Sequence, residues 1–206
     1  MPTLYRAPFS TNVERVALAL AHKGLTVDSF WIEYSDRREV ERVSGQGLVP
    51  VFVDDDGTVV IESMDIVRHI EEHHPSNPLY PADPARREEM LVFIDWFNQV
   101  WKGPPNAIDA ELGKPSPDGA AIERLSRQMA DWLDRFEAML DGRSHLMGDE
   151  FSAADCAAFP FLKFALMRDP EDDERFHRIL EDHQPLGDDH PRLTDWIRRV
   201  NERPRA

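Results

Sequence analysis

The sequence contains one cysteine, Cys156, among its 206 residues. A single cysteine cannot form an internal disulfide, and it leaves no Cys-x-x-Cys motif for metal binding or redox chemistry. Because Cys156 lies in an apolar segment with a helical pattern, we expect it to be an inert thiol of the hydrophobic core.

Long apolar runs are also missing. No segment approaches the roughly 18 uninterrupted apolar residues that a membrane-spanning helix requires. The opening stretch MPTLYRAPFS has neither a basic region nor an apolar run, so we expect no signal peptide. These features predict a cytoplasmic protein with no membrane partner.

Basic residues are outnumbered by acidic ones. The chain has 24 Lys and Arg against 39 Asp and Glu, a formal net charge of −15. Nucleic acids and anionic membranes bind basic surfaces, so we expect neither of them as a partner.

The chain begins with a strand, a helix and a second strand. Residues 3–6 and Val27–Tyr34 have strand patterns, and Ser10-Thr11-Asn12 offers three candidate N-cap residues between them. The helix that follows ends at Lys23-Gly24, and its apolar stripe consists of Val13, Val16, Ala17, Leu20 and Ala21. This order predicts a parallel strand pair with a right-handed crossover.

A hairpin and a third helix come next. After a charged segment that predicts a short helix, Asp36–Val43, Pro50 leads into one strand and Val59–Ile61 forms another. The turn between them is the acidic Asp54–Gly57. Ser63 stands where the N-cap of the next helix is expected. We therefore predict a four-stranded mixed sheet in an α/β domain covering residues 1–75.

The remainder of the chain has only helical patterns. A proline-rich linker is predicted at residues 76–84, and an all-helical domain at residues 85–206. The first helix starts at Asp83-Pro84 and is expected to stop at Gly103-Pro104-Pro105. Ser152–Asp155 resembles a capping box with Asp in place of the usual Glu or Gln, and Phe151 and Cys156 stand at the positions of a hydrophobic staple. The other helical patterns lie around residues 122–140, 176–180 and 193–200.

Five segments together resemble the cytosolic glutathione transferases over nearly the whole chain. They are PFSTNVERVALALAHKG, GLVPVFVDDDGTVVIESMDIVRHIEE, NPLYPAD, GDEFSAADCAAFPFL and HPRLTDWIRRVNERP. The second segment is closest to the omega class, and the serine before the first helix is closer to the theta and zeta classes, so no class is assigned. The resemblance implies a thioredoxin-like N-terminal domain, an all-α C-terminal domain and a homodimer. It also implies glutathione as co-substrate and a small hydrophobic electrophile as its partner; separately, we expect no metal.

The same resemblance implies roles for individual residues. Ser10 falls at the catalytic position, and Val49, before a cis Pro50, would pair its backbone with the cysteinyl part of glutathione. Glu62 and Ser63 would hold the γ-glutamyl amine and carboxylate.

Physical chemistry agrees with the role implied for Ser10. A serine hydroxyl at a helix N-terminus can donate a hydrogen bond to a thiolate. A thiol pKa lowered by ~2 units corresponds to ~2.7 kcal/mol, within reach of one such bond and the helix dipole. On local sequence alone, however, Ser10 and Ser63 are better explained as plain helix caps. Thr11 and Asn12 compete with Ser10 for the same cap.

Two positions depart from common family patterns. Leu48 stands where many relatives have Lys or Gln, so a cation for the glycyl carboxylate has to come from elsewhere. Arg37 or Arg38 is the candidate, although a charged stretch of this kind is usually only a solvated face. Serine in place of cysteine at position 10 argues against thiol–disulfide exchange, which needs a sulfur there.

Other motifs and functions remain to be weighed. His69–His73 fits the zinc-peptidase pattern His-x-x-Glu-His, which arises easily by accident. Trp96, Phe97 and Trp101 either line a substrate pocket or belong to the core. Besides the transferase, the sequence allows a non-catalytic binding or interaction protein with a degenerate site. A zeta-like glutathione-dependent isomerase is a third possibility.

Overall fold

The computed structural model describes residues 1–206, which divide into two units by their internal contacts. The first unit contains Met1–Pro81 together with Arg203–Ala206, and the second contains Ala82–Glu202. The domain limits 1–75, 76–84 and 85–206 remain a prediction from the sequence.

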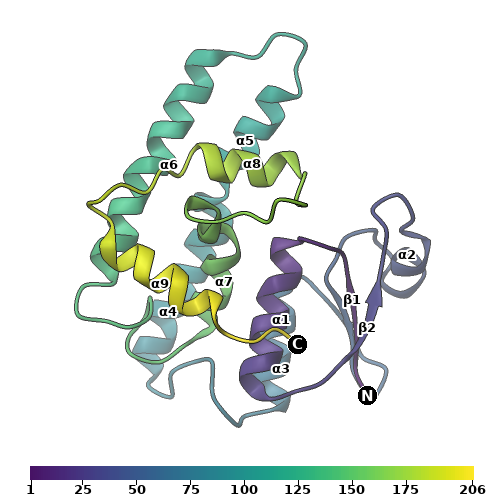
Figure 1. Cartoon of the computed structure of the whole chain (residues 1–206). Coiled ribbons are helices and arrows are strands. Elements are labelled where there is room, and N and C mark those ends of the chain that lie inside the picture. Colours follow the sequence, from purple (N-terminus) through teal and green to yellow (C-terminus); the bar gives the residue numbers. More distant parts are fainter. The chain divides into compact units, whose positions relative to one another are not determined.

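The first unit is an α/β structure, labelled in Figure 1. Its four strands form one sheet in the order β2-β1-β3-β4, with β1 and β2 parallel and the other pairs antiparallel. The elements are β1 (Thr3–Arg6), α1 (Thr11–Lys23), β2 (Asp28–Trp31), α2 (Arg38–Ser44), β3 (Val51–Val53), β4 (Val59–Ile61) and α3 (Ser63–His73). The predicted order of strands and helices is confirmed.

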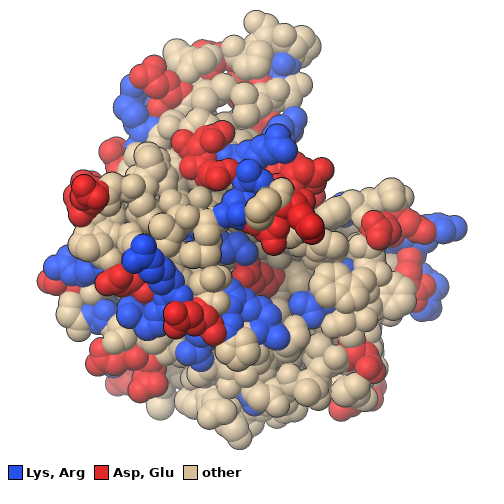
Figure 2. Space-filling view, in the orientation of Figure 1, with Lys and Arg blue, Asp and Glu red and all other residues tan.

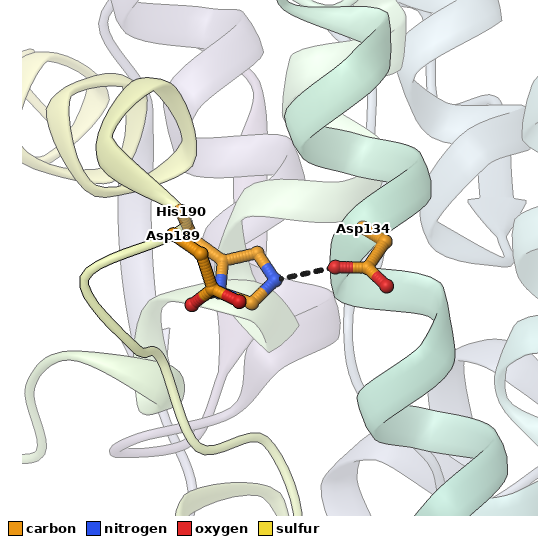
Figure 3. Close-up of side chains that lie close together, drawn as sticks. All are labelled: Asp134, Asp189 and His190. Atoms are coloured by element: carbon orange, nitrogen blue, oxygen red, sulfur yellow. Dashed lines mark hydrogen bonds and ion pairs between the residues drawn. The ribbon is translucent and has the colours of Figure 1, made fainter.

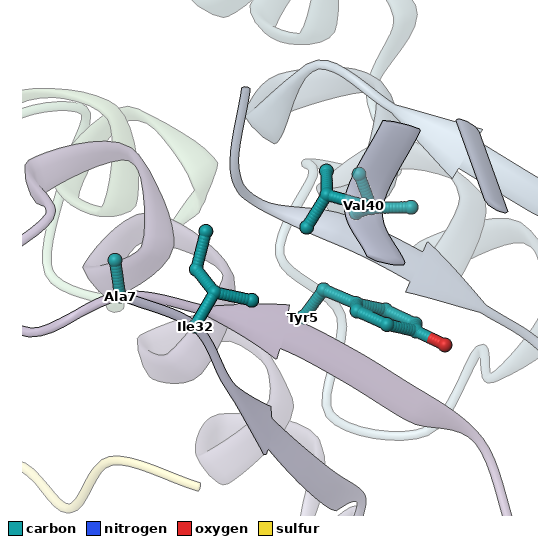
Figure 4. Packing of buried hydrophobic residues seen from close by; sticks show 5 residues of the cluster. Tyr5, Ala7, Ile32 and Val40 are labelled. Atoms are coloured by element: carbon teal, nitrogen blue, oxygen red, sulfur yellow. The ribbon is translucent and has the colours of Figure 1, made fainter. Parts of the chain in front are cut away.

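The two faces of the sheet are covered by different helices. Tyr5 and Val51 lie on the face that packs against Val40 of α2, in a small core with Ile32 and Ala7 (Figure 4). The opposite side carries α1 and α3, which pack against each other (Figure 1). Alternating strand residues therefore point to opposite helical layers.

Two local predictions need correction. β2 ends at Trp31 and does not extend to Tyr34, because the chain turns at Glu33 and Asp36, whose backbones are bridged. α1 is also buried beyond the predicted stripe: Arg15, Leu18 and Ala19 are at most 1% exposed. Leu18 and Ala19, which are apolar and lie outside the predicted stripe, were the signal in the sequence that α1 is buried on several sides.

The last four residues run along α1. Arg203 donates to Nδ1 of His22 at 2.8 Å, and the N–H of Ala206 donates to the carbonyl of Ala17 at 3.1 Å. Arg6 of β1 donates to the carbonyl of Ala206 at 2.8 Å. Since His22 accepts the bond from Arg203, its ring is neutral in this arrangement.

The second unit consists of helices. They are α4 (Pro84–Trp96), the π-helix η1 (Phe97–Trp101), α5 (Gly103–Leu112), α6 (Gly119–Met139), α7 (Ala153–Leu162), the 3₁₀-helix η2 (Lys163–Ala165), α8 (Arg175–Asp182) and α9 (Pro191–Asn201). None of the helices is both long and apolar enough to cross a membrane. With the sheet of the first unit, this all-helical unit confirms the predicted fold class.

The region around residue 100 differs from the prediction. Gly103-Pro104-Pro105 begins α5, which the sequence pattern did not predict. Proline is tolerated there because the N–H groups of a first helical turn have no helical partner. In the π-helix Phe97–Trp101, the rings of Phe97 and Trp101 stack at 4.4 Å in the core, while Val100 is 45% exposed. Phe97 and Trp101 are therefore core residues.

Asp155 is the buried polar centre of the second unit. One carboxylate oxygen accepts from the N–H and the hydroxyl of Ser152 at 2.9 and 2.8 Å, which confirms the predicted capping box. The other accepts from the Leu146 N–H at 3.1 Å and from the Trp196 indole at 2.8 Å. The carboxylate thus joins α7, the preceding loop and α9. Cys156, beside it, is fully buried as predicted.

Replacing Asp155 by alanine should strongly destabilise the protein. The substitution leaves four buried donors without their acceptor, so we expect the free energy of unfolding to fall by at least about 3 kcal/mol. Urea unfolding measures this change. Asp131→Ala, at an exposed position on α6, is the matched control and should change stability by less than about 0.5 kcal/mol. A comparably small loss for Asp155→Ala would contradict the assigned role.

His22 should make stability depend on pH. Burial and the nearby cations Arg203 and Lys23 lower the pKa of His22 below its usual value. An unfolded histidine binds a proton near pH 6.5, whereas folded His22 does so only at lower pH. Between these two values the unfolded state binds more protons, so the free energy of unfolding falls as the pH decreases. We expect His22→Gln to decline less steeply between about pH 7 and about pH 5. An unchanged slope would refute this.

Candidate functional site

The register of the sheet brings three loops to one edge. Tyr5 of β1 and Ile61 of β4 are both paired with Val51 of β3, and both pairs are antiparallel. The chain therefore leaves β1, enters β3 and leaves β4 at the same edge. Ser10 follows β1, Val49 precedes β3, and Glu62 and Ser63 follow β4. These predicted site residues therefore lie at the same edge of the sheet.

Ser10 is the N-cap of α1. Its backbone is extended, and its Oγ accepts a hydrogen bond from the N–H of Val13 at 3.4 Å. This bond leaves the hydroxyl hydrogen available for donation to a ligand. Thr11 and Asn12 are already helical, which decides between the three candidate caps. The preceding residue, Phe9, has a positive φ of 59°.

Val49 lies just before the strand ladder begins. The Val49–Pro50 peptide bond is cis, as expected from the family resemblance. Leu48 is 65% exposed, and Gln46 holds its backbone, with the side-chain amide donating to the Leu48 carbonyl at 2.9 Å and accepting from the Leu48 N–H. Gln46 therefore shapes the loop that presents Val49, a role with no signal in the sequence.

The start of α3 corrects one prediction. Glu62, not Ser63, is the N-cap, and it has a positive φ of 65°. Ser63 is the first helical residue and only 5% exposed. Its Oγ accepts from Arg15 at 3.2 Å and lies 3.5 Å from Oδ1 of Asn12, to which it donates. The hydroxyl of Ser63 therefore faces the interior, and a ligand would meet the backbone N–H groups of this helix start.

These contacts join the starts of α1 and α3 directly. Asn12 and Arg15 on α1 both reach Ser63 on α3. Sequence patterns did not indicate either contact, because the partners are about fifty positions apart along the chain. The consequence is electrostatic: two helix N-termini, each with a partial positive charge, lie next to each other.

Arg37 lies against the loop that leads to Val49. Its guanidinium donates to the carbonyl of Gly47 at 2.6 Å and to the carbonyl of Tyr34 at 3.2 Å, and it stacks over the Tyr34 ring at 5.3 Å. The Arg38 side chain is 87% exposed and pairs with Asp36. Its hydrogen bonds to Asp36 lower the pKa of that carboxyl to about 2. Of the two candidate cations, Arg37 is the one placed beside the site.

In the His-x-x-Glu-His segment, the first histidine pairs with a carboxylate of the hairpin turn. His69 Nε2 lies 2.6 Å from a carboxylate oxygen of Asp54 in the hairpin turn, and the His73 ring packs on His69 at 4.0 Å. Burial opposes ionisation of Asp54, yet the hydrogen bond from His69 keeps the pKa of that carboxyl below its usual value. The pair fastens the hairpin turn to α3.

One group in the second unit has ligand atoms close enough to share a metal ion. These are Asp134, Asp189 and His190, within 4.8 Å of one another. Figure 3 shows Nε2 of His190 turned toward Asp134 on α6, at 3.0 Å, while Nδ1 lies 3.2 Å from Asp189. The two ring nitrogens lie on different edges of the imidazole and face different carboxylates. The arrangement is that of a hydrogen-bonded bridge between α6 and the loop before α9.

Comparisons with known proteins identify the same two regions. Residues 4–78 match the family described as glutathione S-transferase, N-terminal domain, and residues 106–204 match glutathione S-transferase, C-terminal domain. Glutathione S-transferase GstB of Escherichia coli is 29% identical over 170 residues, covering 79% of this chain and 82% of that protein. FtsZ-localized protein A of Caulobacter vibrioides is also 29% identical, covering 76% and 73%.

Solved structures show the same fold. A glutathione S-transferase from Rhodospirillum rubrum superposes with a TM-score of 0.76 at 24% identity, covering 99% of this chain and 89% of the other. A glutathione transferase homologue from Sulfitobacter, with bound glutathione, has a TM-score of 0.72 at 19% identity, covering 98% and 93%.

Replacing Glu62 by glycine should stabilise the fold. A side chain at this positive φ strains the backbone, and glycine removes the Cβ that causes the strain. We expect the free energy of unfolding to rise by up to about 1 kcal/mol, measured by urea unfolding. Asn77→Gly, at a φ of 50° in the loop after α3, is the control and should gain less, because asparagine tolerates positive φ better and its side chain donates to the His22 carbonyl. A clear loss of stability in Glu62→Gly would show that the side chain itself holds the turn.

Proposed function

Because the chain belongs to the glutathione S-transferase family, we propose that it binds glutathione at this sheet edge and activates the thiol for attack on a small hydrophobic electrophile. The observation that carries the proposal is the junction of the α1 and α3 N-termini through Asn12, Arg15 and Ser63. Two adjacent helix starts favour an anionic ligand, and glutathione carries carboxylates and a thiol that can ionise.

Each part of glutathione is assigned to a protein group at this sheet edge. The γ-glutamyl carboxylate meets the free N–H groups at the start of α3, and the exposed Glu62 carboxylate meets the γ-glutamyl ammonium. The cysteinyl backbone pairs with that of Val49, which lies beyond the end of the ladder. Arg37 is proposed for the glycyl carboxylate, since a guanidinium has five N–H donors and the bonds to the Tyr34 and Gly47 carbonyls use only two of them.

The chemical role of Ser10 is to stabilise an anion. Its hydroxyl donates to the glutathione sulfur, and the α1 N-terminus adds positive potential, so the thiol ionises closer to neutral pH. Ser10 is not the nucleophile; the glutathione sulfur is. We further propose a cytoplasmic homodimer that binds neither nucleic acid nor membrane. On the face drawn in Figure 2, basic side chains are interspersed with acidic ones and form no continuous basic surface.

A second function has support from two observations. One relative is named for its localisation with FtsZ, and the exposed Leu48 offers no polar group at the glycyl end. These favour an interaction protein that keeps the fold with a degenerate site. Calorimetry with glutathione decides between the two: the transferase requires binding, and its absence would favour the interaction protein. Turnover of a keto acid without consumption of glutathione would instead indicate the isomerase.

Ser10→Ala should raise the pKa of the bound glutathione thiol. Removing the only proposed donor to the sulfur should shift it upward by about one to two units, measured from the ultraviolet absorbance of the thiolate against pH. Ser10→Asp is the control for capping, because a carboxylate still accepts from Val13 but cannot donate, and its negative charge further opposes ionisation of the thiol. It should keep the stability and also lose the low thiol pKa. If the thiol pKa stayed low in Ser10→Asp, Ser10 would have no role in thiol ionisation and would only cap α1.

A further inference from the structure

The closing segment Arg203–Ala206 reaches the end of α1 that carries Ser10. Arg203 contacts His22 near the C-terminal end of α1, and Ala206 contacts Ala17 at its middle. Arg205 donates to a carboxylate oxygen of Glu14 in the first turn, with its Nη2 at 2.8 Å and its Nε at 3.2 Å. The segment therefore runs antiparallel to α1 over about two turns, toward the proposed glutathione thiol.

Glu14 is the acidic residue of the first turn of α1. Its N–H donates to the carbonyl of Ser10 at 3.0 Å, so the two residues stand one turn apart on the same face. Side chains of a helix lean toward its N-terminus, which carries the Glu14 carboxylate toward Ser10. A negative charge at roughly 8 Å would oppose ionisation of a thiol bound at Ser10 by about half a pKa unit.

We propose that Arg205 tunes the proposed thiolate site by pairing with Glu14. The inference rests on the proposed function and adds to it a positioning residue outside the ligand contacts. The Arg205 and Glu14 side chains are 24% and 15% exposed, so solvent screens the pair less than a surface ion pair. Arg205 both neutralises the carboxylate and holds it along α1. Two further cations lie near the pair. Arg15 follows Glu14 in the chain and donates to Ser63, and Arg6 of β1 donates to the carbonyl of Ala206, which follows Arg205.

The segment also supplies a matched control. Arg203 belongs to the same four residues and also contacts α1, but its partner is His22, two turns from Glu14. If a substitution acts only by loosening the segment, changes at Arg203 and at Arg205 should have the same effect on the thiol pKa. If it acts through the charge of Glu14, only a change at Arg205 should shift the thiol pKa.

The test is a double-mutant cycle on the full chain with glutathione bound. Arg205→Gln should raise the pKa of the bound thiol by about half a unit, and by less at high salt. Glu14→Gln should not raise it. In the Glu14→Gln background Arg205→Gln should have a clearly smaller effect, because only the direct charge of Arg205 is lost and no carboxylate is released. Arg203→Gln should leave the thiol pKa unchanged. Urea unfolding of each variant separates lost stability from the shift of the thiol pKa.

Three results would overturn the inference and leave the proposed function intact. They are a wild-type thiol pKa in Arg205→Gln, an equal shift in Arg203→Gln, and a shift by Arg205→Gln that is undiminished in the Glu14→Gln background. Failure of the wild-type protein to bind glutathione or to lower its thiol pKa would overturn both.

Discussion

The register of the four-stranded sheet is the constraint on which the candidate site depends. With Val51 paired to both Tyr5 and Ile61, the loops around Ser10, Val49 and Glu62 have to meet at one edge. A slip of one residue would exchange the two faces of a strand and move Tyr5 out of the core with Val40. The same pairing that buries the core therefore also places the site.

The site is built at a local cost that the surrounding structure offsets. Phe9 and Glu62 have positive φ values, which side chains other than glycine adopt reluctantly. Close by, Arg15 and Ser63 are buried polar residues that satisfy each other. Farther along α1, buried Lys23 forms an ion pair with Glu71 of α3 and donates to the carbonyl of His74 at 2.8 Å. α1 and α3 are thus joined at both ends, which keeps their N-termini together.

Structural and functional roles coincide in several residues of the first unit. Ser10 caps a helix with the same oxygen whose hydrogen can reach a ligand. Arg37 binds the Gly47 and Tyr34 carbonyls and so shapes the loop where its remaining N–H groups are proposed to act. Arg205 pairs with Glu14 while the segment around it docks on α1. Alanine substitution at such residues changes stability and binding together, so control variants that preserve one role are needed to separate them.

The sequence by itself determined the order of elements in the first unit and the capping box at Asp155. Through the family resemblance it also determined the cis Val49–Pro50 bond and the choice of Ser10, Val49, Glu62 and Ser63 as candidate site residues. These follow from local rules of capping, turns and periodicity, or from motifs in fixed order. Only the tertiary structure decided that Gly103-Pro104-Pro105 opens a helix, that Ser63 turns its hydroxyl toward Asn12 and Arg15, and that Arg205 reaches Glu14. The physical reason is the distance along the chain. A pattern within a few residues carries no information on which of many possible partners, fifty or nearly two hundred positions away, folding will bring into contact.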